Sequence, residues 1–268
     1  MRRGEVTKGS ATALVTGGNS GIGRCYARRL ADLGYNIVIA GLNEERTRRT
    51  VEELKRDFDV GVRSLTIDLA RPEAGRELFE RVTADGTRID VLINNAGTFS
   101  YLDVLRTPVE QIERILALHV LTNTVTCRLF GERMAERGHG YILNMSSYSL
   151  WMPWPGLSLY SASKSYLRSF SVAFSKVMRE RGVRVTSVCP AGVATDLYGL
   201  PPRWQRIGTR LGVLITPDSC ARRALKAMWH GRRNSVPGWW NRLGIPFCLL
   251  MPMFILRIAR KLTLQFQK

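Results

Sequence analysis

Hydrophobic positions alternate along the chain between short apolar runs and longer stretches where apolar and charged residues mix. The short runs are rich in β-branched residues and predict strands at Ala11–Thr16, Asn36–Ala40, Val62–Asp68, Asp90–Asn94, Tyr141–Met145, Arg184–Cys189 and Ser235–Val236. The longer stretches predict helices at Ile22–Leu33, Glu44–Phe58, from near Pro72, Pro108–Arg137 with one break, Tyr160–Arg181 and Pro217–Trp229. Strands that alternate with helices predict an α/β fold: a doubly wound parallel sheet covered on both faces.

Length and composition favour one compact domain. The chain has 268 residues with 45% hydrophobic content and shows no linker or internal repeat. We expect residues 1–240 to form the main unit, with a substrate loop at 196–216. Residues 241–268 are expected to form an apolar and basic extension of the same domain.

Charge and cysteine usage narrow the partners. The formal net charge of +18 favours anionic partners, but no zinc-finger or RNP-like motif indicates nucleic-acid binding. The five cysteines form no CxxC pair or Cys/His cluster, so neither a metal site nor a disulfide framework is predicted. No apolar segment precedes the first strand, which predicts no secretory signal and a cytoplasmic location.

The segment TGGNSGIG, residues 16–23, links the first predicted strand to the first predicted helix. Its glycines at Gly17, Gly21 and Gly23 have G-x-x-x-G-x-G spacing. Positions without side chains let the backbone turn tightly and approach a pyrophosphate, while the helix N-terminus offers amide donors. Glycines also serve ordinary turns, but this strand–loop–helix context favours a dinucleotide site.

Four segments, in order and over nearly the whole chain, resemble the short-chain dehydrogenase/reductase family. They are the glycine loop, IDLA with Asp68, NNAG at Asn94–Gly97 and CPAGVAT at Cys189–Thr195. The resemblance implies a single Rossmann-like domain, with Asp68 near the adenine ring and CPAGVAT near the nicotinamide. The cofactor-binding residues that it implies are Thr16, Gly17, Asn19, Ser20, Gly21, Ile22, Gly23, Asp68, Leu69, Asn95, Ala96, Gly97, Tyr160, Lys164, Pro190, Val193 and Thr195.

Tyr160 and Lys164 lie four residues apart in a predicted helix, so their side chains share one face. A tyrosine has an unperturbed pKa near ~10, and a neighbouring ammonium lowers that pKa by favouring the phenolate. The pair can act as an acid/base for a hydroxyl or ketone, although a tyrosine beside a solvated lysine is the alternative. The segment YSASK matches the family's active-site pattern, and Ser147, 13 residues before Tyr160, resembles its catalytic serine.

The resemblance assigns a role to each of these side chains. Tyr160 would move the proton, Lys164 would tune Tyr160 and reach the nicotinamide ribose, and Ser147 would orient the reacting oxygen. Ser146 competes with Ser147, but its position favours hydrogen bonding at the strand end. His119 stands where the family carries a catalytic asparagine that helps water relay protons. It would titrate near ~6.5 in that role, and a packed helix histidine is the alternative.

The end of the second strand bears on the choice of nicotinamide cofactor. NAD-specific members carry an acid there for the ribose 2′-hydroxyl, but Gly41 and Leu42 occupy those places. Arg46 or Arg24 could reach a 2′-phosphate instead. The surplus of positive charge favours NADP(H) slightly over NAD(H).

Large apolar residues surround the predicted site. Trp151, Met152 and Trp154 lie between Ser147 and Tyr160, and the loop 196–216 carries a further set: Tyr198, Leu200, Pro201, Trp204 and Ile207. They favour a bulky apolar carbonyl or alcohol, such as a steroid, a fatty acyl chain or an aromatic ketone. Ordinary loop packing is the alternative.

The segment 243–261 is almost entirely apolar up to residue 258, with basic flanks and interruptions at Pro246 and Pro252. It is shorter than the ~20 residues that a spanning helix needs. Three roles fit it: a peripheral membrane contact, an oligomer contact, or a flap over the active site.

These features together predict an NAD(P)-dependent oxidoreductase that interconverts a secondary alcohol and a ketone, in a homo-oligomer. A dinucleotide-binding member without catalysis is one alternative. The other is a basic membrane-surface or nucleic-acid-binding protein of the same fold.

Overall fold

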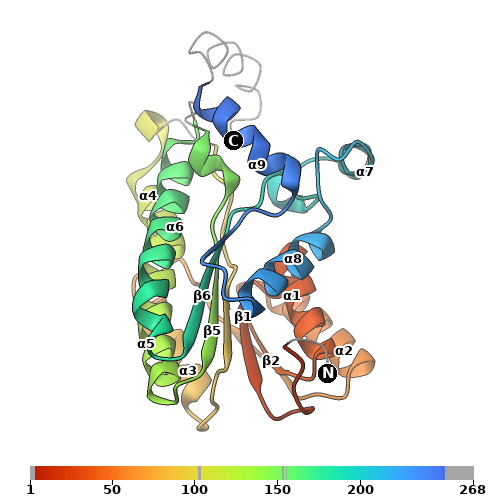
Figure 1. Ribbon diagram of the computed structural model, residues 1–268, viewed down its shortest axis with the longest axis vertical. Coiled ribbons are helices and arrows are strands. Elements are labelled where there is room, and N and C mark those ends of the chain that lie inside the picture. The colour runs from red at the N-terminus through yellow and green to blue at the C-terminus, as the bar shows by residue number, and fades with distance from the viewer. Residues whose placement is uncertain (1–3, 102–103, 153, 155, 251–268) are drawn as a thin grey trace.

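The computed structural model describes residues 4–101, 104–152, 154 and 156–250, except for the side chains of Tyr198, Trp239 and Trp240. Seven parallel strands form one sheet in the order β3-β2-β1-β4-β5-β6-β7 (Figure 1). Their bounds are β1 Thr12–Thr16, β2 Asn36–Gly41, β3 Val62–Thr66, β4 Val91–Asn94, β5 Gly140–Met145, β6 Val183–Val188 and β7 Asn234–Ser235. The predicted doubly wound α/β fold in a single domain is confirmed.

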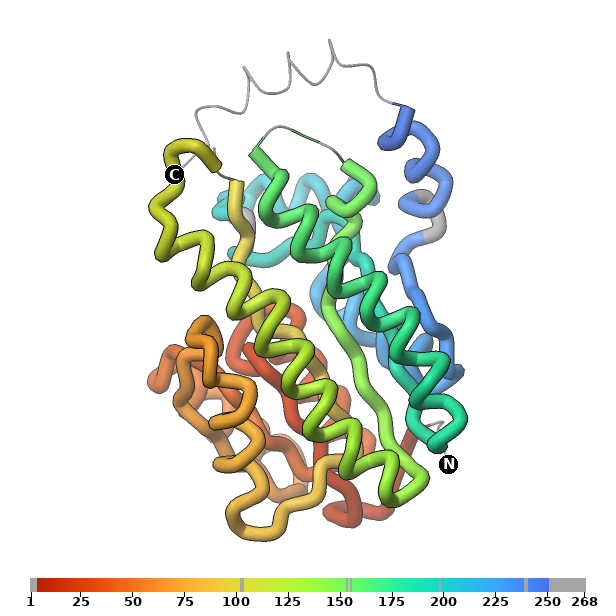
Figure 2. The backbone as a smooth tube through the Cα atoms, turned by 90° about the vertical axis from the view of Figure 1, so that its left-hand side faces the viewer, coloured from red at the N-terminus to blue at the C-terminus, as the bar shows by residue number. Residues whose placement is uncertain are grey.

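Helices cover both faces of the sheet. One face carries α1 Gly21–Asp32, α2 Glu44–Asp57 and α8 Pro217–Trp229. The other carries α3 Ala74–Thr83, α4 Val109–Leu116, α5 Thr122–Glu136 and α6 Ser158–Arg179, which run side by side in Figure 2. Each layer encloses its own apolar core, because side chains alternate between the two faces along each strand.

The long stretch after β4 is one continuous rod with a changed pitch at its centre. Helices α4 and α5 are joined by η2, a π-helical segment at Ala117–Leu121, where the sequence predicted a break. A π-helical turn widens the coil and often marks a functional position. The segment contains His119, so the irregular turn lies where the family resemblance placed a catalytic residue.

Two helices occur where no helix was predicted. Helix α7, Pro202–Arg210, lies inside the loop 196–216, and α9, Trp239–Leu249, forms the start of the apolar tail. Proline disrupts a helix in its interior, where the missing N–H removes a backbone hydrogen bond and the ring clashes with the preceding turn. Pro202 stands in the first turn of α7, where it is tolerated, while Pro246 lies inside α9. Residues 251–261 of the predicted membrane segment lie outside the described part.

The sheet topology fixes where a ligand site can form. β1 lies between β2 and β4, so the chain leaves β1 toward one edge of the sheet and returns to build the other edge. Connections on opposite faces then leave a crevice outside the carboxyl ends of β1 and β4. Short 3₁₀ helices surround this end of the sheet: η1 Val104–Arg106, η3 Tyr148–Trp151 and η4 Asp196–Tyr198.

Candidate active site

The glycine loop turns directly from β1 into α1. Gly17 and Gly21 have φ values of +63° and +50°, a region that side-chain-bearing residues seldom adopt. A Cβ on Gly23 would lie 2.1 Å from the Gly17 carbonyl oxygen, so only glycine permits this close approach. No acidic side chain occupies the first turn of α1, and Ser20 makes no side-chain cap. The amides at this helix start therefore remain open to an anion such as a pyrophosphate.

Hydrogen bonds tie the glycine loop to the segment after β4. The Thr16 hydroxyl accepts bonds from the backbone amides of Asn95 and Ala96, both at 3.0 Å. The Asn95 side-chain amide donates to the carbonyl oxygens of Thr16 and Gly17, at 3.0 and 3.3 Å. These bonds hold the two strand ends at the crevice in one fixed geometry.

Two adjoining cavities follow the carboxyl edge of the sheet and share Gly17, Ser20 and Ala96 among their lining residues. The Asp68 cavity has a volume of about 490 Å³, and the Tyr160 cavity has about 320 Å³. The Asp68 cavity is lined by these predicted residues: Gly17, Asn19, Ser20, Asp68, Leu69, Ala96 and Gly97. The Tyr160 cavity adds Gly21, Ile22, Asn95, Ser147, Tyr160, Lys164, Pro190, Val193 and Thr195.

Three predicted residues line neither cavity and instead contact the residues that do. Thr16 and Gly23 shape the loop, and His119 lies behind the Tyr160 ring. The cavities also include side chains that the sequence reasoning missed: Gln111, Arg114, Ile115 and Leu118. These four repeat at positions i, i+3, i+4 and i+7, so a helical stripe facing the site was available as a signal.

Asp68 is held by two donors at the far end of the crevice. Its carboxylate accepts bonds from the Ala70 amide at 2.9 Å and from Arg114 at 3.0 Å. Burial opposes ionisation, but these two bonds prevail and lower the pKa of Asp68 below its usual value. Asp68 is therefore a fixed acceptor at the position where the resemblance placed an adenine contact.

Tyr160, Lys164 and Ser147 meet in the Tyr160 cavity. Tyr160 and Lys164 point from α6 toward the end of β5, each only 5% exposed. Ser147 lines the cavity with Tyr160, and its side chain is the polar group that favours the Tyr160 phenolate, while the Lys164 ammonium donates to the Met145 carbonyl at 3.0 Å. The Ser146 hydroxyl donates to the Lys164 carbonyl at 2.7 Å, which is a structural role. Of the two serines, Ser147 is the one whose side chain influences the pKa of the Tyr160 phenol.

Burial dominates the electrostatics of this cluster. Burial raises the pKa of Tyr160, and the Ser147 side chain only partly opposes that rise. Burial also lowers the pKa of Lys164 to about 8. The predicted lowering of the Tyr160 pKa by Lys164 is not found, since the ammonium lies over the ring, 5.8 Å from its centroid, and bonds to a carbonyl. Tyr160 is thus a neutral phenol at neutral pH.

His119 is fully buried and both of its ring nitrogens are bonded to the protein. Nε2 accepts from the Thr98 amide at 3.1 Å, which requires the proton on Nδ1, and Nδ1 donates to the Ser163 hydroxyl at 3.0 Å. Ser163 in turn donates to the Tyr160 carbonyl at 2.8 Å. Burial and the Lys164 charge lower the pKa of His119 to about 2. The expected titration near 6.5 is therefore wrong. A second proton on Nε2 would break its bond with the Thr98 amide and bury a positive charge near Lys164.

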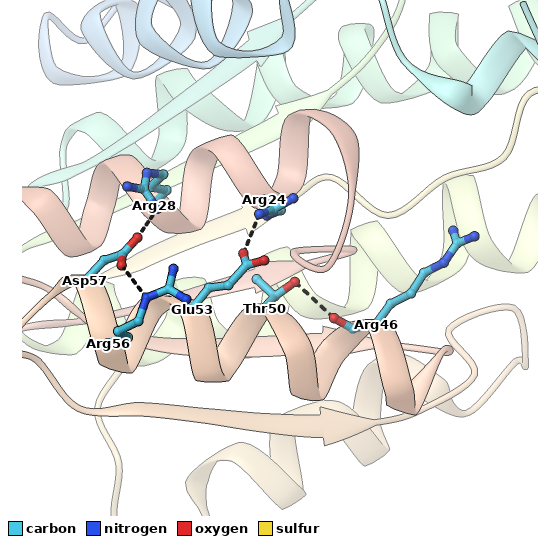
Figure 3. Close-up of polar contacts among 7 residues, drawn as sticks. All are labelled: Arg24, Arg28, Arg46, Thr50, Glu53, Arg56 and Asp57. Atoms are coloured by element: carbon cyan, nitrogen blue, oxygen red, sulfur yellow. Dashed lines mark hydrogen bonds and ion pairs between the residues drawn. The ribbon is translucent and has the colours of Figure 1, made fainter. Parts of the chain in front are cut away.

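The residues near the end of β2 separate the two arginine candidates. Arg24 forms an ion pair with Glu53, and the neighbouring Arg28 pairs with Asp57 at 2.6 Å. Figure 3 shows the Arg46 side chain extending away from these pairs. Arg46 lines the Tyr160 cavity and forms no ion pair with any described residue. Leu42, at the expected acid position, is 66% exposed.

Some of the large apolar residues predicted near the substrate pack into the fold, and others are exposed to solvent. Trp151 and Met152 pack against the cluster of Tyr148, Cys189 and Val236, as the loop-packing alternative expected. Trp204 and Ile207 of α7 are 51% and 42% exposed. The cavities take their apolar walls instead from Phe99, Ile115, Leu118 and Leu197. The side chain of Tyr198 lies outside the described part.

A sequence model of the short chain dehydrogenase family matches residues 11–205. The chain is 31% identical over 234 residues to the very-long-chain 3-oxoacyl-CoA reductase of Bos taurus, covering 84% of this chain and 71% of that protein. It is 34% identical over 190 residues to the probable oxidoreductase EphD of Mycobacterium tuberculosis, covering 70% of this chain and 32% of that protein's length. The chain thus spans about a third of the mycobacterial relative.

Solved structures show the same architecture. A short-chain dehydrogenase from Sphingobium yanoikuyae in complex with NADPH matches with a TM-score of 0.77 and 28% identity, covering 90% of this chain and 95% of that one. A bulky-bulky ketone specific alcohol dehydrogenase from Comamonas testosteroni matches with a TM-score of 0.75 and 26% identity, covering 90% and 93%. Because the family match spans most of the domain and the sheet order agrees with the predicted fold, the chain belongs to the short-chain dehydrogenase/reductase family of NAD(P)-dependent oxidoreductases.

Proposed function

We propose that the protein interconverts a bulky apolar ketone and its secondary alcohol by hydride transfer with a nicotinamide dinucleotide. One observation carries the proposal: the buried side chain of Tyr160 lines the same cavity as Ser147 and the glycine loop. A phenol and a dinucleotide loop that share a cavity can serve proton and hydride transfer to one substrate carbon.

The crevice fits a dinucleotide by shape and charge. The close backbone approach at Gly17 and Gly23 leaves space for a pyrophosphate above the open start of α1. Asp68 and Leu69 would border the adenine ring, and Pro190, Val193 and Thr195 would border the nicotinamide. Bound there, the dinucleotide supplies the hydride donor or acceptor.

The side chains divide the remaining work. Tyr160 is protonated at neutral pH, so it donates a proton to the carbonyl oxygen during reduction and takes one back during oxidation. Ser147 holds that oxygen beside the phenol. Lys164 lies deeper, bonded to Met145, where it can reach a ribose hydroxyl of the dinucleotide. His119 positions the site by joining the Thr98 backbone to α6 through Ser163.

Apolar walls support an apolar substrate. Phe99, from the adjoining Asp68 cavity, packs edge-on against the Tyr160 ring with centroids 5.1 Å apart, and Leu197 lines the Tyr160 cavity. Two relatives agree in kind, since one reduces 3-oxoacyl-CoA and another is specific for bulky-bulky ketones by name. A ketone or 3-oxoacyl group with large apolar substituents is the substrate class that these features support.

The first prediction concerns the phenol. Tyr160→Phe should lower kcat/KM on bulky ketones and 3-oxoacyl thioesters by about 10²–10⁴-fold, because the proton donor is lost. Dinucleotide affinity, measured by fluorescence titration, should change little. The control is Tyr166→Phe on the same helix, whose side chain is 40% exposed. Equal turnover by Tyr160→Phe and wild type would refute the mechanism.

The second prediction concerns Lys164. Burial lowers its pKa from 10.5 to about 8, so between those values the unfolded chain binds a proton that the folded chain does not. Stability should therefore rise with pH through this window. The free energy of unfolding of the wild type minus that of Lys164→Met should rise by up to about 3 kcal/mol across this pH window, as measured by urea unfolding. The matched control is Lys176→Met, at an exposed lysine of the same helix, for which the difference from wild type should not rise in this way. A difference between wild type and Lys164→Met that does not change with pH would contradict the burial of the Lys164 ammonium.

The third prediction concerns His119. A positioning histidine that stays neutral predicts the same shape of the kcat pH profile in His119→Asn and wild type between about pH 5.5 and 8. The KM for the dinucleotide should rise several-fold, because one amide cannot replace both ring bonds. Steady-state kinetics across pH measures both effects. Loss of an ionisation near 6.5 in the variant would instead show that His119 relays protons.

The fourth prediction concerns cofactor choice. If Arg46 binds a 2′-phosphate, Arg46→Ala should weaken NADPH binding by about 10–100-fold and leave NADH binding unchanged, because one charge-assisted bond is lost. The matched variant Arg24→Ala removes an arginine already paired with Glu53 and should have little effect. The reverse pattern in calorimetric titrations would assign the phosphate to Arg24, and equal NADPH and NADH affinity in the wild type would remove the preference.

A further inference from the structure

Positive charge is concentrated in the last part of the chain. Residues 219–268 contain ten Lys and Arg residues and no Asp or Glu, so this segment supplies +10 of the formal net charge of +18. Residues 1–218 contain the other 30 basic residues together with all 22 acidic ones. More than half of the surplus therefore comes from the last 50 residues of the chain, where no carboxylate side chain offsets it.

Five of these cations surround one surface pocket between α8 and the start of α9. The pocket has a volume of about 370 Å³, contains no carboxylate in its lining, and is bordered by Arg222, Arg223, Lys226, Arg232 and Arg242. None of the five forms an ion pair with a residue of the described part. On α1 and α2, by contrast, Arg24 and Arg28 are neutralised by carboxylates (Figure 3). Unpaired cations around a hollow attract an anionic group.

Helix α9, which borders this pocket, carries apolar side chains on its outward side as well as on its packed side. Ile245 and Cys248 pack inward against the cluster of Tyr148, Cys189 and Val236. Leu243, Phe247 and Leu250 are 57%, 78% and 79% exposed. These three follow i, i+4, i+7 spacing and so form one stripe. A contiguous exposed apolar stripe beside cations marks a binding surface rather than ordinary solvent-facing structure.

We propose that this docking face, formed by the cationic pocket and the outward stripe of α9, binds an anionic lipid bilayer. Phosphate headgroups would occupy the pocket while the stripe enters the boundary between headgroups and acyl chains. With 11 residues, α9 is about 16 Å long, shorter than the ~30 Å hydrocarbon core. Within the described part, no helix has the length and apolar character needed to cross a bilayer. In this proposal the docking face lies on the membrane surface.

Charge and apolar area together select this partner. Two copies that met through the docking face would bring the same unpaired cations against each other, which opposes a symmetric dimer. A nucleic acid would satisfy the cations but leave the Leu243–Phe247–Leu250 stripe in water. An anionic bilayer satisfies both parts of the face at once.

The docking face lies next to the substrate end of the crevice. Figure 1 shows α9 above the carboxyl ends of the strands, and the Cys248 thiol lies 3.7 Å from the Tyr148 hydroxyl, one residue after Ser147. If the proposed function holds, an apolar substrate dissolved in the bilayer would reach the Tyr160 cavity from the docked side. Membrane binding itself does not depend on that function.

The test is co-sedimentation of the full chain with vesicles, without dinucleotide or substrate. Vesicles of phosphatidylcholine mixed equally with phosphatidylglycerol should bind at least about tenfold more tightly than phosphatidylcholine alone, and added salt should weaken the binding. Arg222→Glu with Arg223→Glu should reduce binding by about tenfold or more. The matched control, Arg48→Glu with Arg128→Glu, makes the same change in net charge on α2 and α5 and should bind nearly as wild type.

The apolar stripe is tested separately. Phe247→Glu should weaken vesicle binding, whereas Leu211→Glu, at a 74% exposed leucine beyond α7, should not. Leu243→Ser replaces Phe247→Glu if the latter lowers the melting temperature. Equal binding by the stripe variants and wild type would overturn the proposal. So would equal binding to both vesicle types, loss of self-association in Phe247→Glu without loss of vesicle binding, or binding to duplex DNA that exceeds binding to anionic vesicles.

Discussion

The hydrogen bonds between Thr16 and Asn95 are the constraint on which the rest of the site depends. They join the end of β1 to the segment after β4, at the one place where the sheet order turns back on itself. The side chain of Asn95 also fixes the Gly17 carbonyl, against which Gly23 packs without room for a Cβ. A crevice of fixed width follows, with open helix amides on one wall and α6 on the other. The proposed dinucleotide contacts all lie along this crevice, so they depend on the spacing of its two walls.

Burial then decides how the chemistry of α6 works. Tyr160 and Lys164 share a helix face, yet the low polarity around them acts more strongly than their mutual charge, raising the pKa of the phenol and lowering that of the ammonium. His119 extends the same logic, since two protein hydrogen bonds and burial keep it neutral. The cluster is thereby preorganised around a neutral proton donor. The phenol of Tyr160 and the imidazole of His119 both stay uncharged at neutral pH.

The sequence predicted the sheet, the glycine loop and the Tyr160–Lys164 face because local spacing determines them. Strand runs and i, i+4 neighbours depend on residues close in the chain. The missed features depend on tertiary context. The stripe containing Gln111 and Arg114 has helical spacing, but which part of the fold it faces depends on how α4 packs. The low pKa of His119 depends on burial and on the Lys164 charge, which no local pattern reports. Helix α9 was not predicted because Pro246 and Pro252 interrupt the apolar segment, although packing of Ile245 and Cys248 against the Tyr148 cluster supports the helix.

The most direct test of the account is a crystal structure of the protein with NADPH bound. The account predicts the pyrophosphate over the start of α1, the adenine beside Asp68, and the nicotinamide ring between Val193 and Tyr160, with the Tyr160 hydroxyl facing the reactive ring carbon. A dinucleotide bound elsewhere, or a nicotinamide turned away from the Tyr160 hydroxyl, would contradict it.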